Sequence, residues 1–465
     1  MGRPSVMHTI EKCLALAFSL MILGQAYYVR RIVGTWLFPA CIFGLFWFGL
    51  TVIPLVVLLT VPIDPWGTAF ILVCLIAFSF SAVLFPWSKA FKANALKNQL
   101  MSLDYASPFL NQVFYVLSLA TVACIVIDSL AQGVTLRDLL FDLIATAASY
   151  REMASFDNLN STIWDRLSEI MVYDVAILGG LLVSSASVKW HRYRILVLSF
   201  IPGVLFAVAK STKWAMFACI VFFYAGLLAY RVSQSDFCLL KKGSLKKLVL
   251  CAPALVLITT VSFMSRGLQD SEDTDLIQSR LKLLFASYSC GHLYAFSDWY
   301  TSYMAEHWGA RYHSQISYTR EHTTYGAYTF APLFRFVGSK KVFAEGMFDE
   351  YYEYGDILVG NVYTMFRGLI QDFGLLGSLL FMFLLGLLVH WSFFAMLMKR
   401  NQPFTVAVFL FSIGFFYASF VRSLFSWSGI YFTFALLWAI LSVNKRITQA
   451  EGRRLMMARG AAAQA

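Results

Sequence analysis

The sequence predicts an all-α polytopic membrane protein with about 11 transmembrane helices and a large, partly helical external loop. Composition is the first reason: 59% of the 465 residues are hydrophobic and only 14% are charged, with a mean hydropathy of +0.66. The second reason is that runs of about 20 apolar residues, each enough to cross a hydrocarbon layer of about 30 Å, recur along the chain. An ordinary soluble domain does not have this composition.

Each apolar run is predicted to be a helix, because lipid offers no partner for an unpaired backbone group. The predicted spans are residues 13–29, 36–60, 67–87, 109–130, 170–188, 193–209, 213–230, 248–264, 368–397, 403–420 and 429–443. The chain then divides into four regions. Residues 1–264 hold spans one to eight with a smaller external loop at 131–169, residues 265–366 form the large loop, and residues 367–443 hold the last three spans. Residues 444–465 form a cytoplasmic tail, of which Gly452–Ala465 is expected to be frayed.

Basic residues predict the orientation of these spans. One side holds 20 of the 37 Lys and Arg residues and three acidic residues, a net charge of +17, whereas the other holds 17 basic and 23 acidic residues, a net charge of −6. The positive-inside rule makes the first side cytoplasmic, with an external N-terminus and a cytoplasmic C-terminus. The net charge of +11 therefore reflects topology and anionic lipid headgroups, and we expect no nucleic acid partner.

The large loop, residues 265–366, is too long for a simple connector. It contains 22 Phe, Tyr and Trp residues and four of the seven histidines. Helical spacing predicts helices at Leu276–Phe285 and Leu293–Glu306, and the Gly, Pro and Tyr content after Glu321 predicts irregular or re-entrant chain. The histidines lack compact ligand spacing, so we expect no metal and no cofactor.

Five basic residues lie where a predicted span meets the external surface, an uncommon position under the positive-inside rule. They are Lys210, Lys213, Arg266, Arg367 and Arg422. An anionic headgroup such as a diphosphate would explain them, because arginine forks and lysine charges bind phosphate. For each one alone, snorkelling to lipid phosphate or pairing with external acids is the simpler explanation. Three of them, Lys213, Arg367 and Arg422, lie at separate turns, which favours one shared anion-binding site.

Asp372 lies one turn inside the ninth predicted span, where a carboxylate needs a partner. It points about 140° away from Arg367 on a helix, so a direct pair is not expected. We expect it either to bridge to a neighbouring helix or to take part in catalysis.

Tyrosines of the loop are candidates for sugar contacts, because aromatic faces stack on sugar C–H surfaces and phenols bond to sugar hydroxyls. Tyr325, Tyr328 and Tyr363 are the preferred ones, although an interfacial belt explains most loop aromatics. One of Glu321 and His322 is a candidate for the base that takes a proton from a sugar hydroxyl. The alternative is that both are charged residues on the loop surface without a catalytic role.

The sequence Gly360-Asn361-Val362-Tyr363-Thr364-Met365-Phe366-Arg367, followed by Asp372-Phe373-Gly374 and Gly377, closes the large loop and opens the ninth span. Together with the run Tyr325–Phe330 and the layout of spans, it resembles the oligosaccharide repeat unit polymerases, the Wzy-type O-antigen and capsule polymerases of bacteria. The resemblance implies a GT-C-like architecture in the bacterial inner membrane. It also implies glycosyl transfer at the periplasmic face, with the growing glycan passed en bloc from undecaprenyl diphosphate to the next lipid-linked unit.

The resemblance and the residue chemistry together assign roles to individual side chains. Arg367, Arg422, His322 and Glu321 are the expected catalytic residues, Asp372 has a structural role, and the expected substrate contacts are Lys210, Lys213, Arg266, Arg320, Arg335, Tyr325, Tyr328, Asn361 and Tyr363. Many family members have Gly-Ser/Thr-Arg where this chain has Ser211-Thr212-Lys213, and lysine keeps the charge but loses the bidentate geometry. The lipid bilayer, lipid-linked oligosaccharides, a chain-length regulator and a repeat-unit flippase are the implied partners.

Two other functions remain open. An O-antigen ligase uses the same donor with lipid A core as acceptor. A flippase or other lipid-linked glycan transporter should carry charged residues deep in its spans or broken-helix repeats, whereas most charged residues here lie between the spans.

Overall fold

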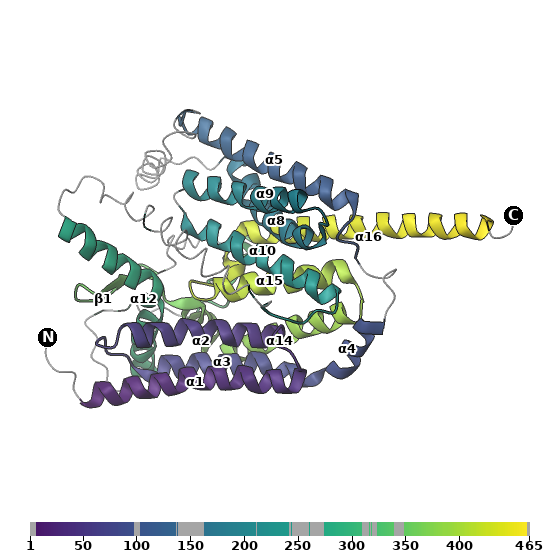
Figure 1. Ribbon diagram of the computed structural model, residues 1–465. Coiled ribbons are helices and arrows are strands. Elements are labelled where there is room, and N and C mark those ends of the chain that lie inside the picture. Colours follow the sequence, from purple (N-terminus) through teal and green to yellow (C-terminus); the bar gives the residue numbers. More distant parts are fainter. Residues whose placement is uncertain are drawn as a thin grey trace. The chain divides into compact units, whose positions relative to one another are not determined.

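The computed structural model describes residues 6–96, 103–135, 137, 162–210, 212–240, 243, 260, 274–308, 316, 318, 323–338 and 348–462 (Figure 1). The architecture is that of an all-α polytopic membrane protein, as the sequence predicts. Nine helices of the described part are long and apolar enough to cross a membrane, and α15 is a shorter apolar helix. These ten coincide with ten predicted spans. The predicted span 248–264 lies almost entirely outside the described residues.

The helices of the first half of the chain are α1 Val6–Val33, α2 Pro39–Val57, α3 Pro65–Phe80, the 3₁₀ turn η1 Ser81–Leu84, α4 Trp87–Leu96, α5 Pro108–Ala131, α8 Ile163–Ser185, α9 Lys189–Ala209 and α10 Lys213–Ser233. Those of the second half are α12 Thr274–Trp308, α13 Ala331–Phe336, α14 Thr364–Leu397, α15 Gln402–Ala418, η3 Leu424–Ser426 and α16 Ser428–Ala462. One antiparallel pair, β1 Tyr352–Tyr354 with β2 Leu358–Gly360, joins Tyr352 to Gly360 in register.

Three helices differ from the sequence prediction. The two helices expected in the large loop are one continuous helix, α12, because no Pro interrupts residues 274–308 and the one glycine there, Gly291, meets no neighbouring atom. The tail expected to be frayed is instead helical to Ala462, because its Ala, Arg, Met and Gln residues favour helix. Helix α14 begins before the predicted span and is broken at Gly374, whose φ of 69° suits glycine.

The chain forms two compact units, and each is described by itself. The first comprises residues 1–85, 271–390 and 415–428, and the second comprises residues 86–270, 391–414 and 429–465. In the first unit α1, α2 and α3 run side by side, and α12 packs on α2 and α3 (Figure 1).

Polar contacts fix α12 on the end of α2. Lys12 of α1 is 7% exposed, and its ammonium donates to Val61 O at 2.8 Å and to the Tyr294 hydroxyl at 3.0 Å. That tyrosine, on α12, also bonds to Leu58 O at 3.1 Å. The lysine and the tyrosine thus satisfy carbonyls that the end of α2 leaves open. Helix α12 is thereby held where it can contribute side chains to the site described below.

The core of the second unit is a bundle of α5, α8, α9 and α10, in which α8 and α10 approach most closely through glycines. A Cβ atom added at Gly180 would lie 2.0 Å from Phe223 O, and one at Gly226 would lie 2.4 Å from Ile177 O. Small residues at such contacts let helix backbones meet in a membrane, where no hydrophobic effect drives helices together.

We expect Gly180→Ala to destabilise the protein by about 1–3 kcal/mol, because the added methyl group has no space and α8 must move away from α10. Thermal unfolding of the purified protein in detergent, followed by tryptophan fluorescence, measures this change. Gly24→Ala on α1 is the matched control, because a Cβ there meets no atom within 4 Å. Equal unfolding temperatures for the two variants would contradict the close contact.

Candidate functional site

The segment that leads into α14 folds around one buried arginine. Arg367 is 0% exposed, and its Nη2 donates to Glu350 Oε2 at 2.9 Å. Its guanidinium carbon lies 3.9 Å from the ring centroid of Phe348, 4.3 Å from that of Tyr363 and 5.2 Å from that of Trp299. We call Arg367 and the rings of these residues, with Tyr318 at 5.6 Å, the arginine cage.

The rings of the arginine cage take the place of the water that would otherwise solvate the guanidinium of Arg367. Arg367 Nε and Nη1 have no hydrogen-bond partner among the described residues, so the aromatic faces take the place of acceptors. Tyr363 donates its hydroxyl hydrogen to Glu350 O at 3.0 Å, which orients the segment 348–350. Burial raises the pKa of Tyr363 to about 12, against a smaller lowering effect of Arg367. The phenol therefore stays protonated and is a donor at neutral pH.

The position of Arg367 corrects its expected role as a cation exposed at the mouth of a span. In this structure a ligand phosphate cannot reach the guanidinium, because the side chain is 1% exposed and already paired with Glu350. The sequence places this acid 17 residues earlier, beyond the reach of any local helical pattern. Arg367 thus holds Phe348 and Tyr363 beside the start of α14.

Asp372, 0% exposed, holds a second segment against α14. Its Oδ1 accepts from Thr324 Oγ1 and from Tyr328 N at 3.0 Å, and its Oδ2 accepts from Thr329 N at 2.6 Å. The turn closes around the carboxylate because Tyr325 and Gly326 adopt φ values of 51° and 100°. Asp372 bridges to a neighbouring segment, here a turn and not a helix.

These two anchors shape a small pocket of about 210 Å³ within the first unit. Its lining residues are Tyr328, Thr329, Phe348, Thr364, Met365, Gly368, Arg422 and Ser423. Arg422 is half-buried, and its guanidinium carbon lies 4.2 Å from the ring centroid of Trp427. The backbone bond from Met365 N to Ser419 O, 2.9 Å long, holds the chain before Arg422 next to the start of α14.

The polar groups of this pocket are one cation and several hydroxyls. Thr329 is 1% exposed, and its Oγ1 has no hydrogen-bond partner among the described residues. A buried hydroxyl in this state costs free energy unless a ligand or water binds it. Thr364 and Ser423 supply two more hydroxyls, and Tyr328 stacked on Phe348 at 5.4 Å forms an aromatic wall. The pocket therefore suits an anionic group that is joined to a hydroxylated one.

Other predicted contact residues lie apart from this pocket. Tyr325 is 78% exposed, and Arg335 on α13 is exposed. Asn361 is half-buried, with its Nδ2 3.4 Å from Phe348 O. The predicted residues Arg266, Arg320, Glu321 and His322 lie outside the described residues.

Lys210 and Lys213 belong to the second unit. Lys210 binds Asp128 and lies 3.1 Å from Asp165 Oδ1. Burial disfavours its charge, but the two carboxylates outweigh burial and leave the pKa of Lys210 above its usual value. Lys210 thus links α5 to α8 through these two carboxylates. Pairing with acidic residues is the simpler of the two explanations that the sequence allows for this lysine. Lys213 is half-buried at the start of α10, and its convergence with Arg422 stays a prediction.

The sequence analysis missed one buried acid. Asp174 of α8 is 0% exposed, and neither carboxylate oxygen has a hydrogen-bond partner in the described part of the chain. It lies eleven residues from the start of α8 and four residues inside the predicted span 170–188. A lone acid inside an apolar run was the available signal. In the same described residues, no three His, Cys, Asp or Glu side chains are grouped to hold a metal ion.

Replacing Arg367 tests the arginine cage. We expect Arg367→Met to destabilise the protein by about 3–5 kcal/mol, because the carboxylate of Glu350, 12% exposed, loses its ion pair with Arg367. The double variant Arg367→Met/Glu350→Gln should recover part of that loss, since no uncompensated charge remains. Thermal unfolding in detergent measures both. Strict additivity of Arg367→Met and Glu350→Gln would contradict the pair.

No family model, no curated protein and no solved structure matches this chain in the three comparisons made with known proteins.

Proposed function

We propose that this chain is a membrane glycosyltransferase that polymerises undecaprenyl-diphosphate-linked oligosaccharide repeat units at the periplasmic face. The observation that carries the proposal is the pocket in which Arg422 lies beside the unpartnered hydroxyl of Thr329. A cation next to hydroxyls and an aromatic wall matches a sugar attached to phosphate. The predicted topology puts this pocket at the external end of the spans, where a lipid diphosphate would have its headgroup.

The proposed glycosyl transfer needs few protein groups. The oxygen of an acceptor sugar hydroxyl bonds to the anomeric carbon, while the bond from that carbon to the diphosphate oxygen breaks and its electron pair leaves with the diphosphate. Arg422 would stabilise the negative charge that grows on this leaving group. Its stacking on Trp427 restricts the guanidinium, so less order has to be gained on binding. The hydroxyls of Thr329 and Thr364 would hold the sugar while its ring acquires oxocarbenium character.

The hydroxyl proton must go to a base, and none of the described residues that line the pocket is a carboxylate or a histidine. Glu321 and His322 remain our candidates, because they precede the turn that Asp372 fixes at Thr324–Thr329. Tyr363 is not a candidate, since its raised pKa of about 12 keeps the proton on the phenol.

We expect wild-type protein in detergent to convert a lipid-diphosphate-linked repeat unit into a ladder of longer products on a gel. Arg422→Ala should slow this conversion by about 10²–10³-fold, because one preplaced cation for the leaving group is lost. Its unfolding temperature should change little, since the side chain is half-buried and lies outside the arginine cage.

Arg280→Ala is the matched control for this assay. Arg280 is an exposed arginine of α12 in the same predicted loop, away from the pocket, and its removal should leave the ladder intact. A ladder at the wild-type rate from Arg422→Ala would refute the assignment of the diphosphate to Arg422. Transfer to lipid A core without a ladder would indicate a ligase.

A transporter of lipid-linked glycans is the second candidate, and Asp174 is the observation that favours it. A buried carboxylate inside a predicted span, with no hydrogen-bond partner among the described residues, is a feature expected of a transport pathway.

Asp174→Asn separates the two functions, because asparagine keeps the shape of the side chain and cannot carry a charge or exchange a proton. If the chain is a polymerase with its site at Arg422, the ladder should persist within about threefold of wild type, since an uncoupled site loses little transition-state binding. If neither wild type nor variant gives a ladder, and Asp174→Asn abolishes the transmembrane movement of a fluorescent lipid-linked glycan that wild type supports in vesicles, the chain is a transporter.

A further inference from the structure

Cationic and aromatic side chains gather at the start of α9, in the second unit. We call five of them the α9 collar: Lys189, Trp190, Arg192, Tyr193 and Arg194. Trp190 is 70% exposed and Tyr193 is 61% exposed, so neither ring packs into the core of the unit. The positive-inside rule assigns this end of α9 to the cytoplasmic side. Tryptophan and tyrosine collect at bilayer surfaces, because their rings contact lipid while their polar edges reach water. The α9 collar thus has the composition of a membrane interface.

The three cations of the α9 collar are exposed and have no acidic partner in the part of the chain that the structure describes. The first turn of α9 contains no acid. Arg192 Nη2 donates to Ala186 O at 2.7 Å, and the guanidinium carbon of Arg194 lies 5.6 Å from the ring centroid of Tyr115 on α5. These contacts restrict both guanidinium groups and leave most of their N–H donors for a ligand. The α9 collar therefore presents three preplaced cations to an anion.

An exposed apolar surface continues along α9 from the collar. Val197, Ile201 and Val204 are exposed and follow Tyr193 at intervals of three and four residues, so they lie on the same face of the helix. An acyl chain can lie along this face while the phosphate joined to it stays at the collar. The combination suits a phospholipid, whereas a free phosphate would leave the apolar face unused.

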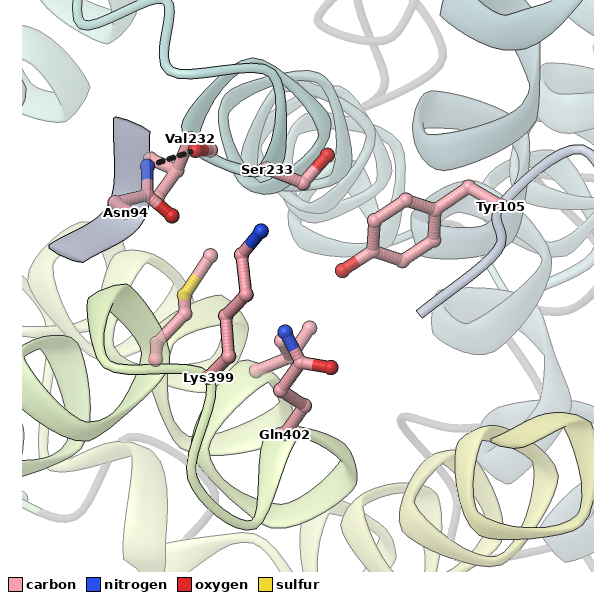
Figure 2. A pocket seen from close by; sticks show the side chains of 8 residues that line it. Asn94, Tyr105, Val232, Ser233, Lys399 and Gln402 are labelled. Carbon is pink, nitrogen blue, oxygen red and sulfur yellow. Dashed lines mark hydrogen bonds between the residues drawn. The ribbon is translucent and has the colours of Figure 1, made fainter. Parts of the chain in front are cut away.

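One enclosed polar space lies in the same unit, at helix ends on the same predicted side. Figure 2 shows Tyr105, Lys399 and Gln402 around this space, which has room for about one water molecule. A phosphate group is larger than that. On this side of the second unit, an anionic headgroup therefore fits the exposed collar and not the enclosed space.

We propose that the α9 collar binds the headgroup of an anionic phospholipid. The phosphate oxygens accept from Lys189 and Arg192, which are three residues apart and so share one face of the helix. Trp190 and Tyr193 keep this site at the level of the headgroups, and the acyl chains lie along Val197 and Val204. A zwitterionic lipid carries the same phosphate together with a cation of its own. The collar, with three cations and no acid, repels that second charge.

Native mass spectrometry of the full chain, taken from micelles that contain equal amounts of phosphatidylglycerol and phosphatidylcholine with the same acyl chains, tests the proposal. We expect wild type to retain phosphatidylglycerol in preference to phosphatidylcholine. Lys189→Gln/Arg192→Gln should lower this preference about 30-fold, because each cation near an anionic headgroup contributes roughly a fivefold factor. Lys189→Gln alone should lower it about fivefold. That single change removes no hydrogen bond among the described residues, so it leaves the fold intact.

Arg453→Gln/Arg454→Gln is the matched control, because it also removes two exposed cations close together in the chain. Both lie on α16 at least ten residues beyond the predicted last span, about 15 Å along the helix and so more than one Debye length from the lipid headgroups. This variant should keep the wild-type preference. The proposal is overturned if wild type retains the two lipids equally or if neither α9 variant alters the preference. It is also overturned if the control lowers the preference as much as Lys189→Gln/Arg192→Gln does, since net charge alone would then attract the lipid.

Discussion

The ion pair of Arg367 with Glu350, enclosed by aromatic rings, is the interaction on which the predicted external part of the first unit depends. A guanidinium removed from water is tolerable only if its charge and its N–H groups find other partners. Here those partners come from α12, from the segment before β1 and from the residue just before α14. One side chain thus links three parts of the chain.

The same enclosure keeps Arg367 out of the pocket lining. The start of α14 contributes shape and a hydroxyl to the pocket, and Arg422 is the cation among the described lining residues. Asp372 completes the arrangement by fixing the turn that carries Thr329. Binding a sugar diphosphate there would require no reorganisation of the buried charges, which is the condition under which preplaced cations stabilise a leaving group best.

The sequence predicts the membrane class well, because an apolar run of about 20 residues has almost no alternative to a spanning helix. It also predicts that Asp372 needs a partner, since its depth alone makes a bare carboxylate costly. It does not predict the cage, whose members come from positions between Trp299 and Arg367 and meet only through tertiary packing. Arg367 therefore looks exposed in the sequence and is buried in the fold. Asp174 can be read from the sequence, but the mean hydropathy of its predicted span is so high that a single acid does not stand out.

The central claim is that a lipid-linked sugar diphosphate binds beside Arg422. The most direct test is photo-crosslinking with an undecaprenyl diphosphate sugar that bears a diazirine on its first sugar, followed by mass spectrometry of the labelled peptides. We expect labels on the peptides that contain Tyr328–Thr329 or Arg422–Ser423, and competition by unlabelled substrate. Labels confined to α8 around Asp174, with none at these two peptides, would contradict it.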